Sequence, residues 1–218
     1  DRVRLDAGVV SVRRSADGVD ILDTSGATMS YDRVILACHT DQALRILDRP
    51  TEQETSILSA IPYSPNRVLL HRDDRLMPTR KKVWASWNYL RSSDQRSDAN
   101  VAVSYWMNRL QGIDASKPLF VTLNPDREPA PETVFAEFSY DHPQFGTDAM
   151  EVQKGIEAIQ GHNATSYAGA WTGYGFHEDG LLSGIRAAER LGATFPWRTQ
   201  PIGLNAADLE KRAVRELA

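Results

Sequence analysis

The chain has 218 residues, of which 41% are hydrophobic, and a formal net charge of −4. This length allows a hydrophobic core in one or two domains, whereas the acidic balance and the lack of a long basic run argue against a nucleic-acid partner. No window has the ~20 apolar residues that a membrane span needs. The single cysteine excludes an internal disulfide and a multi-cysteine metal site. We expect a cytoplasmic protein and leave peripheral membrane contact open.

The first 50 residues carry β-strand signals. Two short strands, Val9–Val12 and Val19–Leu22, flank a turn signal at Asp17-Gly18. Val34–Cys38 is a continuous apolar run, which indicates a strand covered on both faces. The pattern predicts a small meander attached to a parallel sheet.

The segment from Thr51 to Glu54 has the Thr-x-x-Glu pattern of a capping box, so we expect a helix to begin there. Five strand candidates separated by polar loops follow, which predicts an antiparallel sheet in a second domain. These candidates are Arg67–His71, Val83–Tyr89, Val101–Met107, Leu119–Leu123 and Thr133–Phe138.

Four aromatic residues lie on two neighbouring strands of this predicted sheet. They are Trp84, Trp87, Tyr105 and Trp106. Trp84 and Trp87 are separated by an odd step and would face opposite sides of a regular strand. One set could line a substrate pocket while the other is core or surface, and the sequence leaves the assignment open.

The last third of the chain returns to mixed structure. We expect a helix over Asp148–Gln160, a strand over Thr165–Ala168, a glycine-rich turn and a helix over Gly180–Leu191. The first amides of a helix have no partner within it, and together with the helix dipole they attract a phosphate or an electron-rich ligand edge. This arrangement predicts a nucleotide-type cofactor.

No G-x-G-x-x-G motif occurs in the chain. The segment Gly173-x-Gly175-x-x-Glu178 lacks the third glycine and follows its strand too late. A dinucleotide site needs a first strand–turn–helix unit with that motif. We therefore expect this unit to lie outside these residues, and the chain to be the C-terminal part of a longer protein.

Five segments carry a resemblance to a known family. They are Ala37–Leu44, Trp84–Tyr89, Tyr105–Asn108, Val121–Pro125 and Gly173–Gly184. The chain resembles the C-terminal half of the flavin amine oxidase superfamily, which includes monoamine oxidases, protoporphyrinogen oxidases and carotenoid desaturases. Within it, the chain is most similar to a bacterial branch of predicted NAD/FAD-binding proteins that is linked with cyclopropane fatty acid synthases.

The resemblance implies an α/β fold: a partial FAD-binding, Rossmann-like domain with a β-meander, plus an antiparallel-sheet substrate domain. Residues 1–50 would form the meander and buried strand of the FAD-binding domain, and residues 51–146 the substrate domain. Residues 147–200 would return to the FAD-binding domain, and 201–218 would form a polar tail. Without the G-x-G-x-x-G unit, we expect these residues alone to bind FAD weakly or not at all.

The resemblance also implies cofactor-binding residues. Val9 takes the position at which the family clamps the adenine through main-chain bonds, and Gly169 and Ala170 take those near the pyrophosphate and ribityl groups. No metal site is implied.

Gly180, Leu181 and Leu182 occupy the helix start that faces the flavin pyrimidine edge in the family. Reduced flavin gathers negative charge at that edge, and a helix N-terminus stabilises such charge by ~1 kcal/mol.

Three positions depart from the family pattern. The lysine that amine oxidases place near the flavin falls on or near Val68, and Cys38 lies in the wrong segment to tether flavin covalently. Trp171 replaces an acidic residue that often follows the glycine turn. These departures argue against simple amine oxidation and for a non-covalent flavin.

The catalytic residues remain open. His177 is the single weak candidate for a base beside the flavin, and a structural histidine is the alternative. Glu178 and Asp179 are interpreted as first-turn acids that complement the helix dipole.

The resemblance implies an FAD-dependent oxidoreductase that moves a hydride from a C–H or C–N bond to the flavin. The link with lipid-modifying enzymes favours an apolar small-molecule substrate such as an unsaturated or modified fatty acyl chain. Two alternatives are an amine or polyamine oxidase and a non-catalytic flavin-binding scaffold of a lipid-modifying system.

Overall fold

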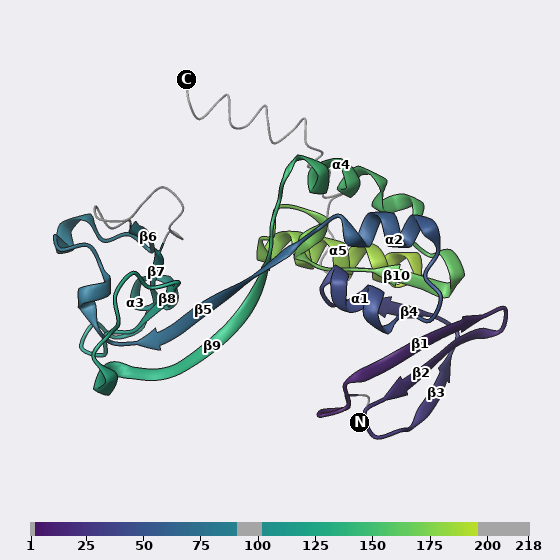
Figure 1. The fold of residues 1–218 in the computed structure, drawn as a ribbon, viewed down its shortest axis with the longest axis horizontal. Helices are drawn as coiled ribbons and strands as arrows, with labels where there is room; N and C mark the ends of the chain where they lie inside the picture. The colour runs from purple at the N-terminus through teal and green to yellow at the C-terminus, as the bar shows by residue number, and fades with distance from the viewer. Residues whose placement is uncertain (1–2, 91–101, 196–218) are drawn as a thin grey trace. The chain divides into compact units, whose positions relative to one another are not determined.

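The computed structural model describes residues 3–90 and 102–195 and combines helices with antiparallel and parallel sheets (Figure 1). This confirms the predicted mixed architecture. The chain divides into two compact units: unit 1 comprises Asp1–Ile61 and Phe145–Ala218, and unit 2 comprises Pro62–Gln144. The predicted polar tail, 201–218, lies outside the described residues.

Unit 1 contains two small sheets and four α-helices among its described residues. Its elements are β1 (Val9–Ser15), β2 (Gly18–Asp23), β3 (Thr28–Tyr31), β4 (Val34–Leu36), α1 (Thr40–Ile46), α2 (Glu52–Ser59), α4 (Thr147–Gly155), β10 (Thr165–Tyr167) and α5 (His177–Arg190). Strands β1, β2 and β3 form an antiparallel meander, as predicted. Strands β4 and β10 pair in parallel, with Val34 opposite Thr165 and Leu36 opposite Tyr167.

The meander forms because its inward-facing residues are apolar and its turn can adopt positive φ. Val12 and Val19 are fully buried, and Gly18 has a φ of +138° at the start of β2. A Cβ at Gly18 would collide with the carbonyl of Tyr31, so glycine is required there.

Helix α2 begins with the predicted capping box. Thr51 Oγ1 accepts the amide of Glu54 at 3.1 Å, and the Glu54 carboxylate accepts the amide of Thr51 at 2.8 Å. Helix α1, which was not predicted, precedes it.

The sequence analysis assigned α2 to the substrate domain, but α2 belongs to unit 1. The reason is a buried polar network. Glu54 is 1% exposed, and its carboxylate forms an ion pair with Arg14 of β1 and accepts the hydroxyl of Tyr167 of β10 at 2.8 Å. These bonds join α2 to both sheets of unit 1.

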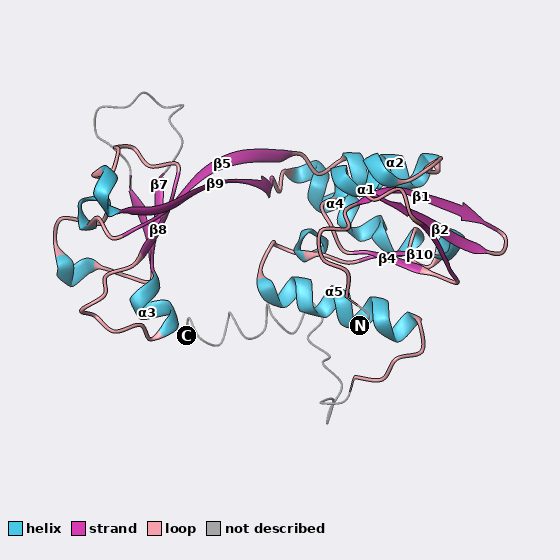
Figure 2. Cartoon of the chain, turned by 90° about the horizontal axis from the view of Figure 1, so that it is seen from below, coloured by secondary structure: helices cyan, strands magenta, loops and turns pink. Residues whose placement is uncertain are grey.

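Unit 2 is built on one five-stranded antiparallel sheet in the order β6-β7-β8-β5-β9. Its elements are β5 (Tyr63–His71), β6 (Trp87–Leu90), β7 (Ala102–Trp106), α3 (Met107–Gln111), β8 (Phe120–Leu123) and β9 (Val134–Pro143). Strands β5 and β9 form a long two-stranded ribbon that extends beyond the shorter strands (Figure 2). Residue Val101, predicted to begin a strand, lies outside the described residues.

The predicted strand Val83–Tyr89 is wrong in its first half, because β6 begins only at Trp87. The preceding segment is a loop held by side chains. Asn88 exchanges hydrogen bonds with the backbone of Ala85 at 2.8 and 3.0 Å. The predicted helix over 148–160 is likewise shorter, since α4 ends at Gly155 and a 3-10 turn follows.

Candidate functional site

The two parallel strands of unit 1 end at the same edge, where the chain after β10 enters a turn over residues 169–176, here called the glycine turn. Ala168 still donates its amide to the carbonyl of Leu36 at 3.0 Å, and the chain then leaves the sheet at Gly169. A Cβ at position 169 would lie 2.5 Å from Nε1 of Trp171. Only glycine fits there.

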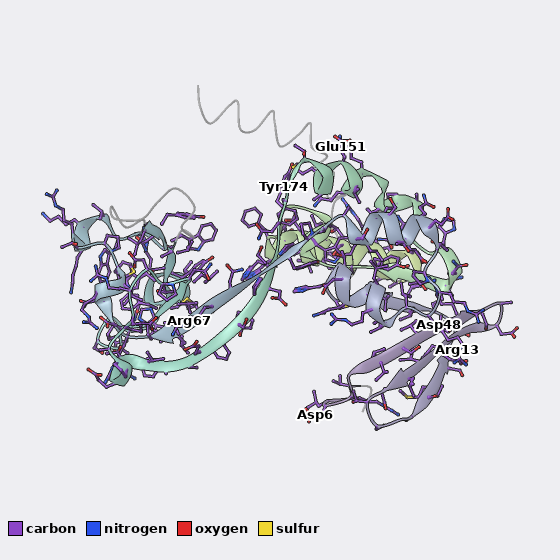
Figure 3. All side chains as sticks on the ribbon, viewed as in Figure 1. Asp6, Arg13, Asp48, Arg67, Glu151 and Tyr174 are labelled. Carbon is purple, nitrogen blue, oxygen red and sulfur yellow. The ribbon has the colours of Figure 1, made fainter. Side chains whose placement is uncertain are left out.

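The carboxylate of Asp179, in the first turn of α5, is hydrogen-bonded to the backbone of the glycine turn. Its Oδ2 atom accepts the amides of Tyr174, which Figure 3 labels, and Phe176 at 3.0 and 2.9 Å. A Cβ at Gly173 would collide with the same carboxylate. Glu178 and Asp179 lie in the first turn of α5, as predicted.

Helix α5 begins three residues earlier than predicted, at His177 instead of Gly180. The amide of Gly180 donates to the carbonyl of Phe176 at 3.2 Å. The amides of Leu181 and Leu182 are likewise beyond the first turn, where helical hydrogen bonds use them. These three residues therefore lie beyond the first residues of α5, and their role in binding the flavin stays a prediction.

The amides at the start of α5 that lack a partner within the helix include those of His177, Glu178 and Asp179. A further amide lies beside them: within the described part of the chain, no acceptor bonds the amide of Ala170. A Cβ at Gly180 would lie 3.6 Å from that nitrogen, an ordinary contact distance, so α5 packs closely against Ala170. These amides and the helix dipole attract an electron-rich group.

Val9 is the first residue of β1 and is 41% exposed. It lines an apolar cleft of about 680 Å³ in unit 1, together with Val34, Ile35 and Leu36 of β4 and with Gln42 of α1. The pairing register shifts directly after Val9, which leaves this end of the strand irregular. Its role in adenine binding stays a prediction.

His177 is exposed at the first position of α5, and its role as a base also stays a prediction. Cys38 follows β4, and burial raises the pKa of its thiol, which makes it a poor nucleophile. The described residues include no cluster of His, Cys, Asp and Glu that could hold a metal ion. They also include no helix that is both long and apolar enough to cross a bilayer.

Sequence reasoning missed two side chains that hold the glycine turn. Ser183 Oγ accepts the amide of Gly169 at 2.9 Å and donates to the carbonyl of Gly180 at 2.7 Å. Gln153 of α4 donates to the carbonyls of Trp171 and Gly173 at 2.8 and 2.6 Å. Neither residue carries a local sequence signal, because each acts on backbone groups that only the tertiary fold brings close.

Unit 2 contains a second feature of functional interest, a stretch of sheet face that carries no Asp, Glu, Lys or Arg among its described strand residues. The strand register places ten uncharged side chains on this face: Trp87, Tyr89, Val103, Tyr105, Val121, Leu123, Leu70, Val68, Ala136 and Phe138. We call it the uncharged face. Trp87 is 50% and Tyr89 is 72% exposed, so part of this apolar surface is open to solvent.

The opposite face of the same sheet is packed and polar. Asn88, Ser104 and Thr122 form a cross-strand row on it and are buried. The aromatic residues divide between the faces: Trp87 packs edge-to-face against Tyr105 on the uncharged face, at a centroid distance of 6.1 Å. Apolar surface that is partly open to solvent can mark a ligand-binding or interaction site.

The sequence model of the flavin-containing amine oxidoreductase family matches residues 1–118. The chain belongs to this family. No curated protein matches the sequence. The matched span includes Val9 and most of unit 2, and it ends before the glycine turn.

The fold is also similar to that of solved flavoprotein structures. A CLA-producing fatty acid isomerase from P. acnes has 15% sequence identity and a TM-score of 0.59, covering 86% of this chain and 48% of its own. A putrescine oxidase variant with redesigned cofactor binding has 12% identity and a TM-score of 0.58, covering 88% and 50%. A reduced UDP-galactopyranose mutase has 13% identity and a TM-score of 0.55, covering 86% and 47%. The chain thus spans about half the length of these structures.

The cofactor of this family is a flavin, FAD. The glycine turn fits such a group, because the Ala170 amide, which no acceptor bonds among the described residues, lies next to the first turn of α5. The amides of His177 and Glu178 would add to the attraction for an electron-rich ring edge.

Proposed function

We propose that this protein is an FAD-dependent oxidoreductase that removes a hydride from a C–H or C–N bond of an apolar substrate, with an unsaturated or modified fatty acyl chain as the substrate class. The flavin, when bound, is the hydride acceptor. The chain contributes amides that orient the cofactor without a covalent bond. The single cysteine of the chain is Cys38, and its backbone carbonyl accepts a hydrogen bond from the indole of Trp171 at 3.1 Å.

The uncharged face of unit 2 is the observation that carries the choice of substrate. An amine substrate is a cation at neutral pH, and burying it is costly unless a carboxylate balances its charge. None of the ten residues of the uncharged face is charged. Val68, at or near the family's lysine position, belongs to this face. Burying hydrocarbon against it is favourable by roughly 25 cal/mol per Å².

Two further points support an acyl substrate. One structurally similar protein is a fatty acid isomerase, and the resemblance to a branch linked with cyclopropane fatty acid synthases points to the same class. Both are analogies of fold or family, and they add to the argument from the uncharged face.

The test uses the intact protein loaded with FAD under anaerobic conditions. We expect unsaturated fatty acids to bleach the absorbance band of oxidised flavin and putrescine to leave it unchanged. A protein that retains no FAD would contradict the assignment as a flavoenzyme.

A matched pair of variants sharpens the test. Tyr89→Asp adds a charge to the uncharged face, and Ser139→Asp adds one at an exposed position on the other side of the sheet. We expect about tenfold weaker fatty acid binding or more for Tyr89→Asp, because the acyl chain would have to desolvate a carboxylate. Equal effects of both variants on fatty acid binding would contradict the proposed role of the uncharged face.

Amine or polyamine oxidation is the second candidate, favoured by the family itself and by the similarity to a putrescine oxidase. Reduction of the flavin by putrescine, with peroxide release in air, would establish it instead. Bound FAD that neither fatty acids nor amines reduce would identify a scaffold without turnover.

A further inference from the structure

Trp171 occupies the position at which the family often has an acidic residue, yet its side chain is turned into the protein. Trp171 is 4% exposed, and its indole Nε1 donates to the carbonyl of Cys38 at 3.1 Å. Cys38 directly follows the β4 region and Trp171 follows β10. The indole therefore connects the ends of the two parallel strands.

The same ring determines the path of the glycine turn. A Cβ at Gly169 would lie 2.5 and 2.6 Å from the Nε1 and Cδ1 atoms of Trp171, so the backbone at 169 rests against the edge of the indole. The Ala170 amide, next in the chain, is the one without an acceptor among the described residues. The direction of that amide thus depends on the position of the ring.

Gln153 holds the turn from the other side. Its single Nε2 group donates to the carbonyls of both Trp171 and Gly173. With these two bonds, the Trp171–Cys38 bond and the bond from the Gly169 amide to Ser183, the backbone from 169 to 173 is held at both ends.

We propose that Trp171 and Gln153 are positioning residues of the flavin site: they hold the glycine turn so that the Ala170 amide keeps a fixed direction, and position 171 makes no side-chain contact with the cofactor. This inference rests on the proposed function, because it assigns the glycine turn to FAD. Preorganised donors bind a charged group more strongly than mobile ones, since no reorganisation accompanies binding.

The first test compares two tryptophan variants of the intact protein. Trp171→Phe keeps an aromatic ring and removes the N–H that bonds Cys38. Trp84→Phe is the matched control, because it removes an indole N–H that bonds a backbone carbonyl, that of Pro78 at 2.7 Å, in unit 2. We expect Trp171→Phe to raise the exchange rate of the amides in the glycine turn and the Kd for FAD by about fivefold each, as the loss of one hydrogen bond implies.

The second test exchanges a donor for an acceptor. Gln153→Glu places a carboxylate oxygen against two carbonyl oxygens, and Gln144→Glu, at an exposed position of unit 2, is its control. We expect Gln153→Glu to weaken FAD binding at least tenfold and to change the shape of the visible flavin absorbance of the saturated protein. A change in shape at saturation reports a moved ring environment, which a loss of stability alone would not produce.

The third variant separates positioning from direct contact. If position 171 contacted the ribityl chain, Trp171→Asp would restore the acidic residue of the family and tighten FAD binding. We expect it to weaken binding more than Trp171→Phe does, because it places a carboxylate beside the carbonyl of Cys38. Tighter binding by Trp171→Asp, or an FAD affinity of Trp171→Phe within twofold of the wild type, overturns the proposal.

Failure of the proposed function is distinguishable from failure of this inference. An intact protein that binds no FAD removes the flavin assignment and with it the positioning role. Normal FAD binding by the wild type together with unchanged exchange of the glycine-turn amides in Trp171→Phe removes the positioning role alone.

Discussion

Unit 1 buries a charged pair, whereas unit 2 buries a chain of neutral groups. In unit 1, burial alone would raise the pKa of Glu54, but hydrogen bonds from Arg14, from the Thr51 amide and from Tyr167 hold that pKa below its usual value. The same burial, with the Glu54 charge beside it, raises the pKa of the Tyr167 hydroxyl. The carboxylate stays ionised, and among the described residues Arg14 is the cation that pairs with it.

In unit 2 the buried chain starts at His71, which is fully buried. Its Nδ1 atom accepts the Asp73 amide at 3.2 Å, so the proton lies on Nε2, which donates to Thr122 Oγ1 at 2.8 Å. Thr122 then donates to Ser104 at 2.7 Å, and Ser104 donates to the carbonyl of Leu76 at 2.8 Å. Every group in this chain is neutral and bonded.

The two units should therefore respond differently to the loss of one buried polar group. Removing one member of a buried ion pair leaves an uncompensated charge and costs about 3–5 kcal/mol. Removing one hydroxyl from a neutral chain leaves unsatisfied dipoles and costs about 1–3 kcal/mol. Four measurements test this contrast.

The largest effect is expected from Arg14→Met. It leaves Glu54 buried without a cation, and we expect a loss of about 3–5 kcal/mol in the free energy of unfolding of unit 1. Urea denaturation, with hydrogen exchange as the readout, measures the free energy of unfolding of unit 1. Arg13→Met is the control, because Arg13 is 72% exposed and pairs with Asp48 only at 3.5 Å. A loss below about 1 kcal/mol for Arg14→Met would remove the contrast between the units.

A smaller effect is expected from Thr122→Val, which interrupts the neutral chain between His71 and Ser104. We expect a loss of about 1–3 kcal/mol in unit 2. Thr28→Val on exposed β3 makes the same chemical change outside any buried network, and its effect should be within about 0.5 kcal/mol. If the two substitutions cost the same, the chain does not stabilise unit 2.

The two units should also differ in their response to pH. Burial lowers the pKa of His71 below its ordinary 6.5, and the nearby Asp73 carboxylate opposes only part of the shift. The unfolded chain therefore binds this proton first, and unit 2 loses stability as the pH falls from 6.5 towards the lowered folded value. The lowered pKa of Glu54 stabilises unit 1 at pH values above 4.5, the ordinary pKa of a glutamate. This stability is lost as the pH falls below 4.5 and through the lower pKa of Glu54 in the folded protein.

Urea midpoints of both units between about pH 8 and pH 4 test these windows. Unit 2 should weaken first. His71→Asn should reduce its pH dependence near 6.5, and the same dependence in His71→Asn as in the wild type would show that another group is responsible.

The smallest effect is expected from Arg67→Met on the surface of unit 2. Arg67, labelled in Figure 3, pairs with Glu128 and Glu137, and its side chain is 41% exposed. Such pairs contribute about 0–1 kcal/mol, and salt screens them. A loss above about 2 kcal/mol, or one independent of salt, would mean that surface charge matters as much as the buried pair.

The local elements were largely predictable because their signals are local. The capping box at Thr51, the meander turn at Asp17-Gly18 and the strand before Gly169 each follow from neighbouring residues. The start of α5 was misplaced because Asp179 extends the helix by accepting amides from the glycine turn, a bond that spacing alone does not reveal.

The candidate site was predictable only in outline. Gly169 and Ala170 lie in the turn that the motif indicated, but the residues that hold it, Gln153 and Ser183, come from separate helices. The orientation of Trp171 was equally inaccessible, because it depends on the carbonyl of Cys38, 133 residues away in the chain.

Most element types, the mixed architecture and the family follow from local features of the sequence, since periodicity, caps and glycine spacing act over a few residues. The tertiary structure alone decided which buried charges are balanced, which amides remain unpaired and which sheet face is free of charge. Those properties depend on contacts between distant segments, and burial makes their energies large.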